Sequence, residues 1–235
     1  PAEIDIPGDS EDSEVEHTKA MINVFRLKQD LYQESYVGFI FTDKEAGYTQ
    51  SSLFRDYNRV VGIDGHFKFQ NYYRFSFQIL GSQSKVEKDK TGFVPATSFN
   101  FSRNSRHIRA SIDYKSLPED FEAATGFFRR KDIQSLSSRV SYAILPMNDI
   151  IVDIRPSFEY RRIYDFENTL TDEQFNLTTS INGWRGSRIW TTFSSSLERY
   201  EGIDFRKKTY RGVFSSQPLS WIGWILTYSF GDGIY

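Results

Sequence analysis

Acidic and basic side chains recur at every second position along one stretch of the chain, and they are the residues best suited to chemistry. Asp153, Arg155, Glu159 and Arg161 share this spacing, and Glu198 is a further carboxylate in a polar alternating segment. Two carboxylates about 5–10 Å apart could hydrolyse a glycosidic bond. Each carboxylate stands among arginines, however. We therefore interpret the set as a ladder of charges, with Asp153 beside Arg155 and Glu159 beside Arg161, rather than as a catalytic pair.

Histidine, cysteine and the common catalytic motifs add little. Cysteine is absent, and His17, His66 and His107 lack the spacing of a metal site. His66 lies between the polar residues Asp64 and Lys68 and is expected to be hydrated. No GxSxG, SxxK or Walker loop is present, so we expect no enzyme activity, no cofactor and no metal site. The enzymatic alternative is a hydrolase with its site among the loops, and its candidate residues would be Glu119, Asp120, Glu122, Asp172 and Glu173.

The alternation that spaces these charges is the main structural signal. In residues 60–84, for example, Ile63 and Phe67 alternate with Asp64 and Lys68, which is the period of a strand with one apolar and one polar face. The chain has 21 Phe, 14 Tyr and 4 Trp, or 17% aromatic residues, a composition that favours strands. From residue 20 onward the pattern recurs about twelve times and predicts an all-β protein without a convincing helix.

The connections between these segments alternate in length. Short ones read FQNYY, SRNSRH, LPMND, GWRGS and SQPLSW, and longer ones read DKEAGYTQSSLFRDY, SKVEKDKTGFVP, SLPEDFEAATGFFRRKD, YDFENTLTDEQ and RYEGIDFRKK. Successive turns of an antiparallel up-and-down meander lie at opposite ends of its sheet. The sequence therefore predicts such a meander, with tight turns at one end and long loops at the other.

The length of the strands bears on their environment. Strands of soluble sandwiches usually have about 5–6 residues, whereas these alternating segments run for about 9–12, which suits a tilted transmembrane strand. Bilayer strands must form a closed barrel, with an apolar outside, a polar inside and girdles of Tyr and Trp. We expect a transmembrane β-barrel or a large part of one. A soluble all-β protein and a sheet covering another domain are the alternatives. The mean hydropathy of −0.51 agrees with a barrel, because half of each strand would face water.

The alternation assigns each polar or charged residue to one face of its strand. Arg162, Arg199 and Tyr164 fall on the apolar face, so we expect them beyond the hydrocarbon band. The compact basic cluster Arg129, Arg130 and Lys131 is predicted to contact phosphate head groups at the rim. A net charge of −2 argues against a nucleic-acid partner. The polar side chains predicted to face the lumen are Asp64, Lys68, Arg74, Arg109, Asp113, Arg139, Asp153, Arg155, Glu159 and Arg161.

The domain organisation follows from the same patterns. Residues 1–18 are acidic, contain two prolines and lack periodicity, which predicts a flexible linker or loop. Residues 19–235 form the predicted barrel segment. No run of apolar residues is long enough for a transmembrane helix, and no secretory leader is recognisable.

Several phrases give the chain a family resemblance: NVFRLKQD, SYVGFIFTDK, GIDGHFKF, DFEAATGFFRR and SFGDGIY. Over residues 20–235 it resembles bacterial outer-membrane barrel proteins that carry an N-terminal family-9-type carbohydrate-binding domain before a barrel of uncharacterised role. The resemblance implies an internal segment of a longer protein, whose partners would include that domain and further barrel strands. These motifs are structural and specify no chemistry.

Together these observations predict a non-enzymatic, porin-like protein in the outer membrane of a Gram-negative bacterium. It would contact the lipid bilayer and lipopolysaccharide and allow the transport or capture of glycans or other small solutes, with glycans suggested by the resemblance alone. The loops of residues 44–57 and 116–130 would gate the passage of these solutes or bind them. A plugged structural or adhesion barrel, a soluble β-sheet binding module and the loop-borne hydrolase are the alternatives.

Overall fold

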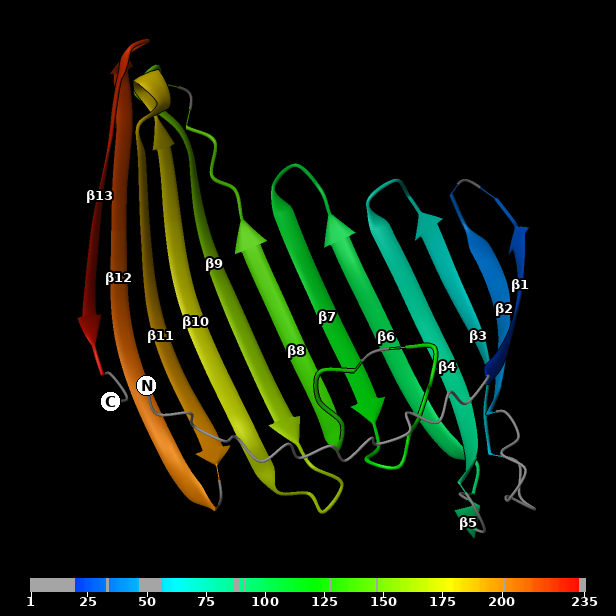
Figure 1. The fold of residues 1–235 in the computed structure, drawn as a ribbon. Helices are drawn as coiled ribbons and strands as arrows, with labels where there is room; N and C mark the ends of the chain where they lie inside the picture. The colour runs from blue at the N-terminus through cyan, green and yellow to red at the C-terminus, as the bar shows by residue number, and fades with distance from the viewer. Residues whose placement is uncertain are drawn as a thin grey trace, which may run out of the picture.

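The protein is built on one antiparallel sheet, seen in a computed structural model (Figure 1). The structure describes residues 20–32, 34–46, 56–86, 89–90, 92–126, 128–146, 148–200 and 202–232. The predicted linker 1–18 lies outside these residues. The strands are β1 (Ala20–Asp30), β2 (Tyr36–Ala46), β3 (Tyr57–Phe69), β4 (Tyr73–Val86), β5 (Asp89–Lys90), β6 (Val94–Asn104), β7 (Ile108–Leu117), β8 (Ile133–Tyr142), β9 (Ile151–Tyr164), β10 (Leu170–Gly183), β11 (Arg188–Tyr200), β12 (Ile203–Leu219) and β13 (Ile222–Gly231), and a short 3-10 helix η1 spans Trp184–Gly186.

The strands follow one another in chain order across the sheet, which confirms the predicted all-β meander. Each long strand pairs antiparallel with the one before it, and only the two-residue β5 lies off this path, beside β4. β1 and β13 form the two edges, and neither pairs with a further strand within the part of the chain that the structure describes. The sheet is therefore open between these two edges.

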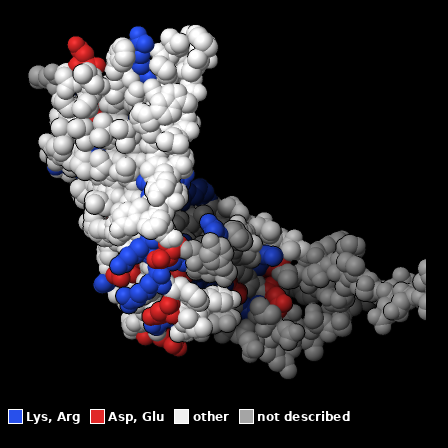
Figure 2. Space-filling model, turned by 90° about the vertical axis from the view of Figure 1, so that its left-hand side faces the viewer, with Lys and Arg blue, Asp and Glu red and all other residues white. Residues whose placement is uncertain are grey.

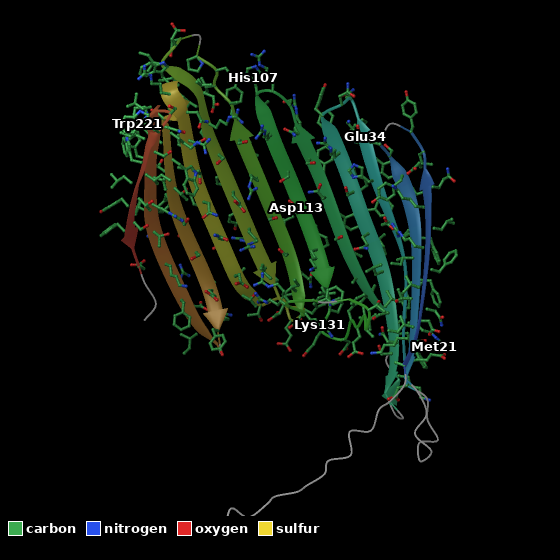
Figure 3. The ribbon with its side chains drawn as sticks, turned by 45° about the horizontal axis from the view of Figure 1, so that its top comes forward. Met21, Glu34, His107, Asp113, Lys131 and Trp221 are labelled. Carbon is green, nitrogen blue, oxygen red and sulfur yellow. The ribbon has the colours of Figure 1, made fainter. Side chains whose placement is uncertain are left out.

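The two ends of the sheet differ as the connections predicted. Glu34 and His107 mark the end with short turns, and Lys131 lies at the opposite end, which carries the longer connection between β7 and β8 (Figure 3). We call these the short-turn end and the long-loop end. Asp113 lies between them.

Three connections differ from their expected lengths. YDFENTLTDEQ and RYEGIDFRKK were predicted as long loops, but β10 already begins at Leu170 and β12 at Ile203. β12 is accordingly a strand of 17 residues that includes part of the predicted loop RYEGIDFRKK. The charged ends of these strands continue the backbone pairing of the sheet, because their side chains pair between strands, as in the ion pair Arg199–Asp204. The predicted tight turn LPMND lies in a longer connection between β8 and β9.

The sheet curves around its polar face. In Figure 1 the middle strands face the viewer, whereas the strands toward both edges are seen nearly edge-on. On β3 the polar side chain of Asp64 is 8% exposed, whereas its apolar neighbour Ile63 is 49% exposed. Side chains converge on the inside of a curved sheet and spread apart on its outside, so the polar face is concave and the apolar face is convex.

Aromatic side chains cover much of the convex face and pack across neighbouring strands. Rings of Phe158, Phe175, Phe193 and Tyr210 form a continuous row over β9 to β12, with successive centroid distances of 5.1, 6.2 and 4.8 Å. Such cross-strand aromatic contacts stabilise a sheet by about 0.2–1 kcal/mol each. They leave the outer sides of the rings uncovered, and many large apolar residues of this face are exposed.

Candidate functional site

All ten residues predicted to line a lumen share the concave face. The strand register places Asp64 opposite Gln78, and Arg74 lies opposite Lys68 on the same two strands. Farther along the sheet, Arg139 pairs with Ser111 on one side and Glu159 on the other. The set named above, from Asp64 to Arg161, therefore forms one continuous polar surface. That this surface encloses a water-filled lumen remains a prediction.

An ion pair that the sequence did not reveal crosses the N-terminal part of this face. Both terminal guanidinium nitrogens of Arg26, on β1, donate to the carboxylate of Asp64, on β3, with Nη2 2.7 Å from Oδ2. The intervening strand β2 presents Gly38 at this point, where an added Cβ would lie 2.7 Å from both Arg26 Nη2 and Asp64 Oδ1. Gly38 therefore leaves the space that this pair needs.

The neighbouring residues His66 and Lys68 have structural partners. His66 Nδ1 lies 2.8 Å from Ser76 Oγ, and its ring stacks with Tyr36 at a centroid distance of 6.0 Å. Lys68 Nζ donates a hydrogen bond of 2.5 Å to Glu34 in the β1–β2 turn. This hydrogen bond lowers the pKa of the Glu34 carboxyl below its usual range. His66 and Lys68 therefore both have partners within the protein, and hydration of His66 remains a prediction.

The predicted charge ladder on β9 is present, but one of its pairs is different. Arg155 Nε donates to Asp153 Oδ1 at 3.0 Å, as expected. Glu159 instead binds Arg139 on β8, at 2.8 Å, and Arg161 donates to Gln174 on β10. Directly opposite residues of antiparallel strands are about 5 Å apart, which is closer than residues two apart on one strand, at about 6.6 Å. Glu159 therefore binds Arg139, which lies directly opposite it, rather than Arg161 on its own strand.

Five arginines line a hollow of about 600 Å³ toward the short-turn end of the concave face. Arg74, Arg109, Arg139 and Arg155, one each from β4, β7, β8 and β9, lie on the concave face, whereas Arg103 of β6 shares the convex parity of Tyr73, its partner on β4. The lining also contains the indole of Trp190, the carboxylate of Glu159 and small hydroxyl side chains, among them Ser102, Ser111, Ser141, Ser157, Thr178 and Ser180.

The other end of the concave face is apolar and is covered by the described residues of the β7–β8 loop, 118–126 and 128–132. Phe121 is completely buried there, and the surrounding core contains Val60, Ala96, Leu117 and Ile133. In Figure 1 this loop turns back across the face of the sheet that points toward the viewer. The predicted binding or gating loop 116–130 thus lies over the concave face. The other predicted loop, 44–57, falls largely outside the described residues.

Hydrogen bonds fix this loop to the wall. Asn58 donates from Nδ2 to the carbonyl of Glu122 at 3.0 Å and accepts from the amide of Ala124 at 2.8 Å. The amide of Glu122 also donates to Ser82 Oγ at 3.2 Å. Asn58 and Ser82 are 8% and 1% exposed, respectively. Two buried polar side chains therefore bind the loop backbone, and the sequence analysis did not single out either of them.

The carboxylates of the hydrolase alternative are not gathered into one site. Glu119 and Asp120 are exposed in the β7–β8 loop. Asp172 accepts a hydrogen bond from Arg130 at 2.6 Å, whereas Glu173 binds Tyr160 and Arg162 on the opposite face of the sheet. The same contacts show that Arg130 of the predicted head-group cluster is already paired. Arg129 is exposed and Lys131 is half-buried, and their contact with lipid remains a prediction.

The charged residues of the convex face lie near strand ends. Arg162 pairs with Glu173 at 2.7 Å and Arg199 with Asp204 at 2.6 Å, both toward the long-loop end. Their position beyond a hydrocarbon band remains a prediction. Figure 2 shows Lys, Arg, Asp and Glu gathered below a broad, almost uncharged surface on the side of β13. On β3, β4 and β8 the convex residues of positions 61–69, 73–81 and 134–142 carry no charge.

The described residues contain no group of three or more His, Cys, Asp or Glu side chains placed to hold a metal ion. Among the same residues, no helix has the length and apolar character needed to cross a membrane. The candidate site consists of the polar concave surface with its ion pairs, its basic hollow and the β7–β8 loop that lies over it.

The fold defines an all-β protein whose single curved meander sheet is apolar on the outside and polar on the inside. The chain belongs to the family described as "Domain of unknown function (DUF5916)", whose model matches residues 5–229. Neither the curated proteins nor the solved structures contained a match to this chain.

Proposed function

We propose that the chain forms the wall of a non-enzymatic β-barrel in a bacterial outer membrane, with lipid on its convex face and water on its concave face. The barrel would let small polar solutes, including glycans, pass or be captured. The observation that carries this proposal is the reversed exposure of the sheet, whose apolar side chains point outward and whose charged side chains converge inward.

The dimensions of the convex face support a membrane location. Its uncharged segments in β3, β4 and β8 each cover about nine residues, close to the roughly 9–11 that a tilted strand needs to cross a bilayer. Soluble monomers rarely expose continuous apolar patches above a few hundred Å². Apolar residues are exposed here on strand after strand, including Ile63, Ile112 and Phe158. A lipid environment would cover this surface.

The two edge strands, β1 and β13, indicate what further pairing the chain would need in a membrane. In hydrocarbon, each unpaired backbone polar group costs several kcal/mol, so barrel strands must be paired on both sides. β1 and β13 have paired neighbours on one side only within the described residues. We propose that these edges close with each other or with further strands of the full-length protein. Lipid and lipopolysaccharide would surround the wall, with Arg129 near their phosphates. A carbohydrate-binding-like domain would be a further part of the protein.

The β7–β8 loop favours a second candidate, a barrel that is plugged and serves as an anchor or adhesin. The loop lies over the concave face, and its buried Phe121 and the clamp from Asn58 hold it in place. Conductance of the full-length protein in planar bilayers separates the two candidates. Stepwise ion currents would support an open passage, whereas a protein that inserts but stays silent would support the plug.

Nitroxide labels on adjacent residues test the membrane proposal directly. Ile112 and Ser111 are neighbours on β7 and point to opposite faces. In proteoliposomes, we expect a label at Ile112 to be relaxed by oxygen, which concentrates in lipid, and a label at Ser111 by a water-soluble nickel complex. Equal response at both sites, or access of the nickel complex at Ile112, would overturn the proposal.

A further inference from the structure

The hollow that contains Arg74, Arg109, Arg139 and Arg155 has an excess of positive charge. Arg139 pairs with Glu159, and Arg155 pairs with Asp153. Arg74 and Arg109 have neither a hydrogen bond nor an ion pair within the described part of the chain. These four concave-face guanidinium groups are therefore matched by two carboxylates, Glu159 in the lining and Asp153 beside it, in a chain whose net charge is −2. The hollow is therefore positively charged, although the net charge of the whole chain is negative.

The register brings two of these arginines close together. Arg109 lies opposite Ser141, two residues from Arg139, so Arg109 and Arg139 are diagonal neighbours on adjacent strands. Such neighbours have Cα separations of about 7–8 Å, which long arginine side chains can span. Arg155 lies farther away, on β9, two residues from Ser157, which is opposite Ser141. Like charges at this spacing repel each other. A bound anion would relieve the repulsion, because guanidinium groups bind oxyanions through parallel hydrogen bonds.

The rest of the lining would suit the body of a small solute. The floor between the arginines consists of the short hydroxyl side chains of Ser111, Ser141 and Ser157. These residues leave room above the sheet and can both donate and accept hydrogen bonds. At one side, the Trp190 ring has the guanidinium of Arg211 5.8 Å from its centroid. An indole face offers a flat apolar surface against which a ring can stack.

We infer that this hollow is a binding site for a small solute that carries an oxyanion, such as a carboxylate or phosphate, on a ring-shaped body. Arg74 and Arg109, which make no ion pair among the described residues, provide the excess positive charge, and Trp190 contacts the ring. The inference rests on the proposed function only in requiring that water reach the concave face. Binding at this hollow makes the passage or capture selective for acidic solutes.

Calorimetric titration of the full-length protein in detergent micelles tests this site, with galacturonate and galactose as probes. Galacturonate is expected to bind saturably and galactose to bind at least tenfold more weakly, because galactose lacks the carboxylate. Inorganic phosphate is expected to compete with galacturonate, and higher salt should weaken the binding by screening.

The sharpest variant is Arg74→Gln with Arg109→Gln, because it removes the two arginines without leaving a carboxylate unpaired. It should weaken galacturonate binding at least tenfold. Arg161→Gln is the matched control, since Arg161 lies on the same face but outside the hollow and binds only Gln174 among the contacts of the structure. Circular dichroism of each variant verifies that the sheet remains folded.

Equal affinity for galacturonate and galactose would overturn the inference, as would unchanged binding by the folded double variant. Neither measurement needs a bilayer. Failure of the anion site is therefore distinguishable from failure of the membrane proposal, which the nitroxide labels on β7 report independently.

Discussion

The convex and concave faces of the sheet use the same strands, yet their exposure is opposite to that of a soluble protein. Val152 on the convex face is 58% exposed, whereas the adjacent Asp153 on the concave face is 7% exposed. In water, a sheet gains stability by covering its apolar face. Here the polar face is shielded by curvature, ion pairs and a loop. The apolar side chains therefore lie on the more exposed surface, whereas many polar groups of the inner surface find partners within the protein.

The largest effect should come from the apolar end of the concave face. Phe121→Ala empties a fully buried position and should cost about 3–5 kcal/mol of loop packing. Trypsin cleavage after Arg129 and Arg130 should then accelerate roughly a hundredfold or more, at about 1.4 kcal/mol for each factor of ten. The control is Phe166→Ala, which removes an exposed ring and should leave cleavage unchanged. Equal cleavage of both variants would show that Phe121 does not hold the loop.

The second effect contrasts the two faces at neighbouring positions of β4. Phe77 points to the convex face and Gln78 to the concave face. Phe77→Arg should therefore destabilise the inserted protein by roughly 2–4 kcal/mol, the cost of arginine near the bilayer midplane, whereas Gln78→Arg should be tolerated. Urea unfolding of the protein in phospholipid vesicles measures both. Similar midpoints for the two variants would contradict the assignment of the faces.

A third, smaller effect concerns close packing on the concave face. Gly38→Ala places a methyl group against the Arg26–Asp64 pair, and overpacking of this kind costs about 1–3 kcal/mol. The midpoint of urea unfolding should fall. Gly212→Ala is the control on β12, because nothing lies within 4 Å of its added Cβ. If Gly38→Ala proves as stable as that control, the pair does not depend on the glycine.

The smallest expected effect is at the charged border of the convex face. The hydrogen bond from Arg199 lowers the pKa of the Asp204 carboxyl in the folded protein. The pair should therefore stabilise the β11–β12 turn above the ordinary pKa of aspartate, and this contribution should fade as pH falls through the lowered folded value. Hydrogen exchange of the turn between pH 6 and 3 should show a modest loss of protection. In Asp204→Asn this pH dependence should be absent, and its persistence would assign the effect to another group.

Much of the fold could be predicted because its signals are local. Alternation places Ile63 and Asp64 on opposite faces whatever strand lies beside them. The turns at residues 70–72 and 105–107 also limit each strand to pairing with its neighbour. The predicted loop lengths were less accurate at 165–169 and 201–202, because charged residues such as Arg199 and Asp204 look like loop residues until their cross-strand pairing is known.

The concave site could be predicted only in part. The sequence identified Asp64, Arg109, Arg139 and Glu159 as polar-face residues, but it missed Arg26 and the clamp by Asn58. Arg26 sits in a strand whose apolar residues occur on both parities, so alternation alone did not mark it. Asn58 has the polar parity, but its role depends on a loop more than 60 residues later in the chain.

From its amino-acid order alone, this protein is committed to strands with one polar and one apolar side, joined as an antiparallel meander. These properties depend on residues that are close together along the chain. Only the tertiary structure decided that Arg139 binds Glu159 and that Arg26 crosses Gly38 to reach Asp64. It also decided that the described residues of the β7–β8 loop fold back over the concave face and that five arginines line one hollow. Those contacts depend on the register and curvature of the sheet, which arise from all of its strands together.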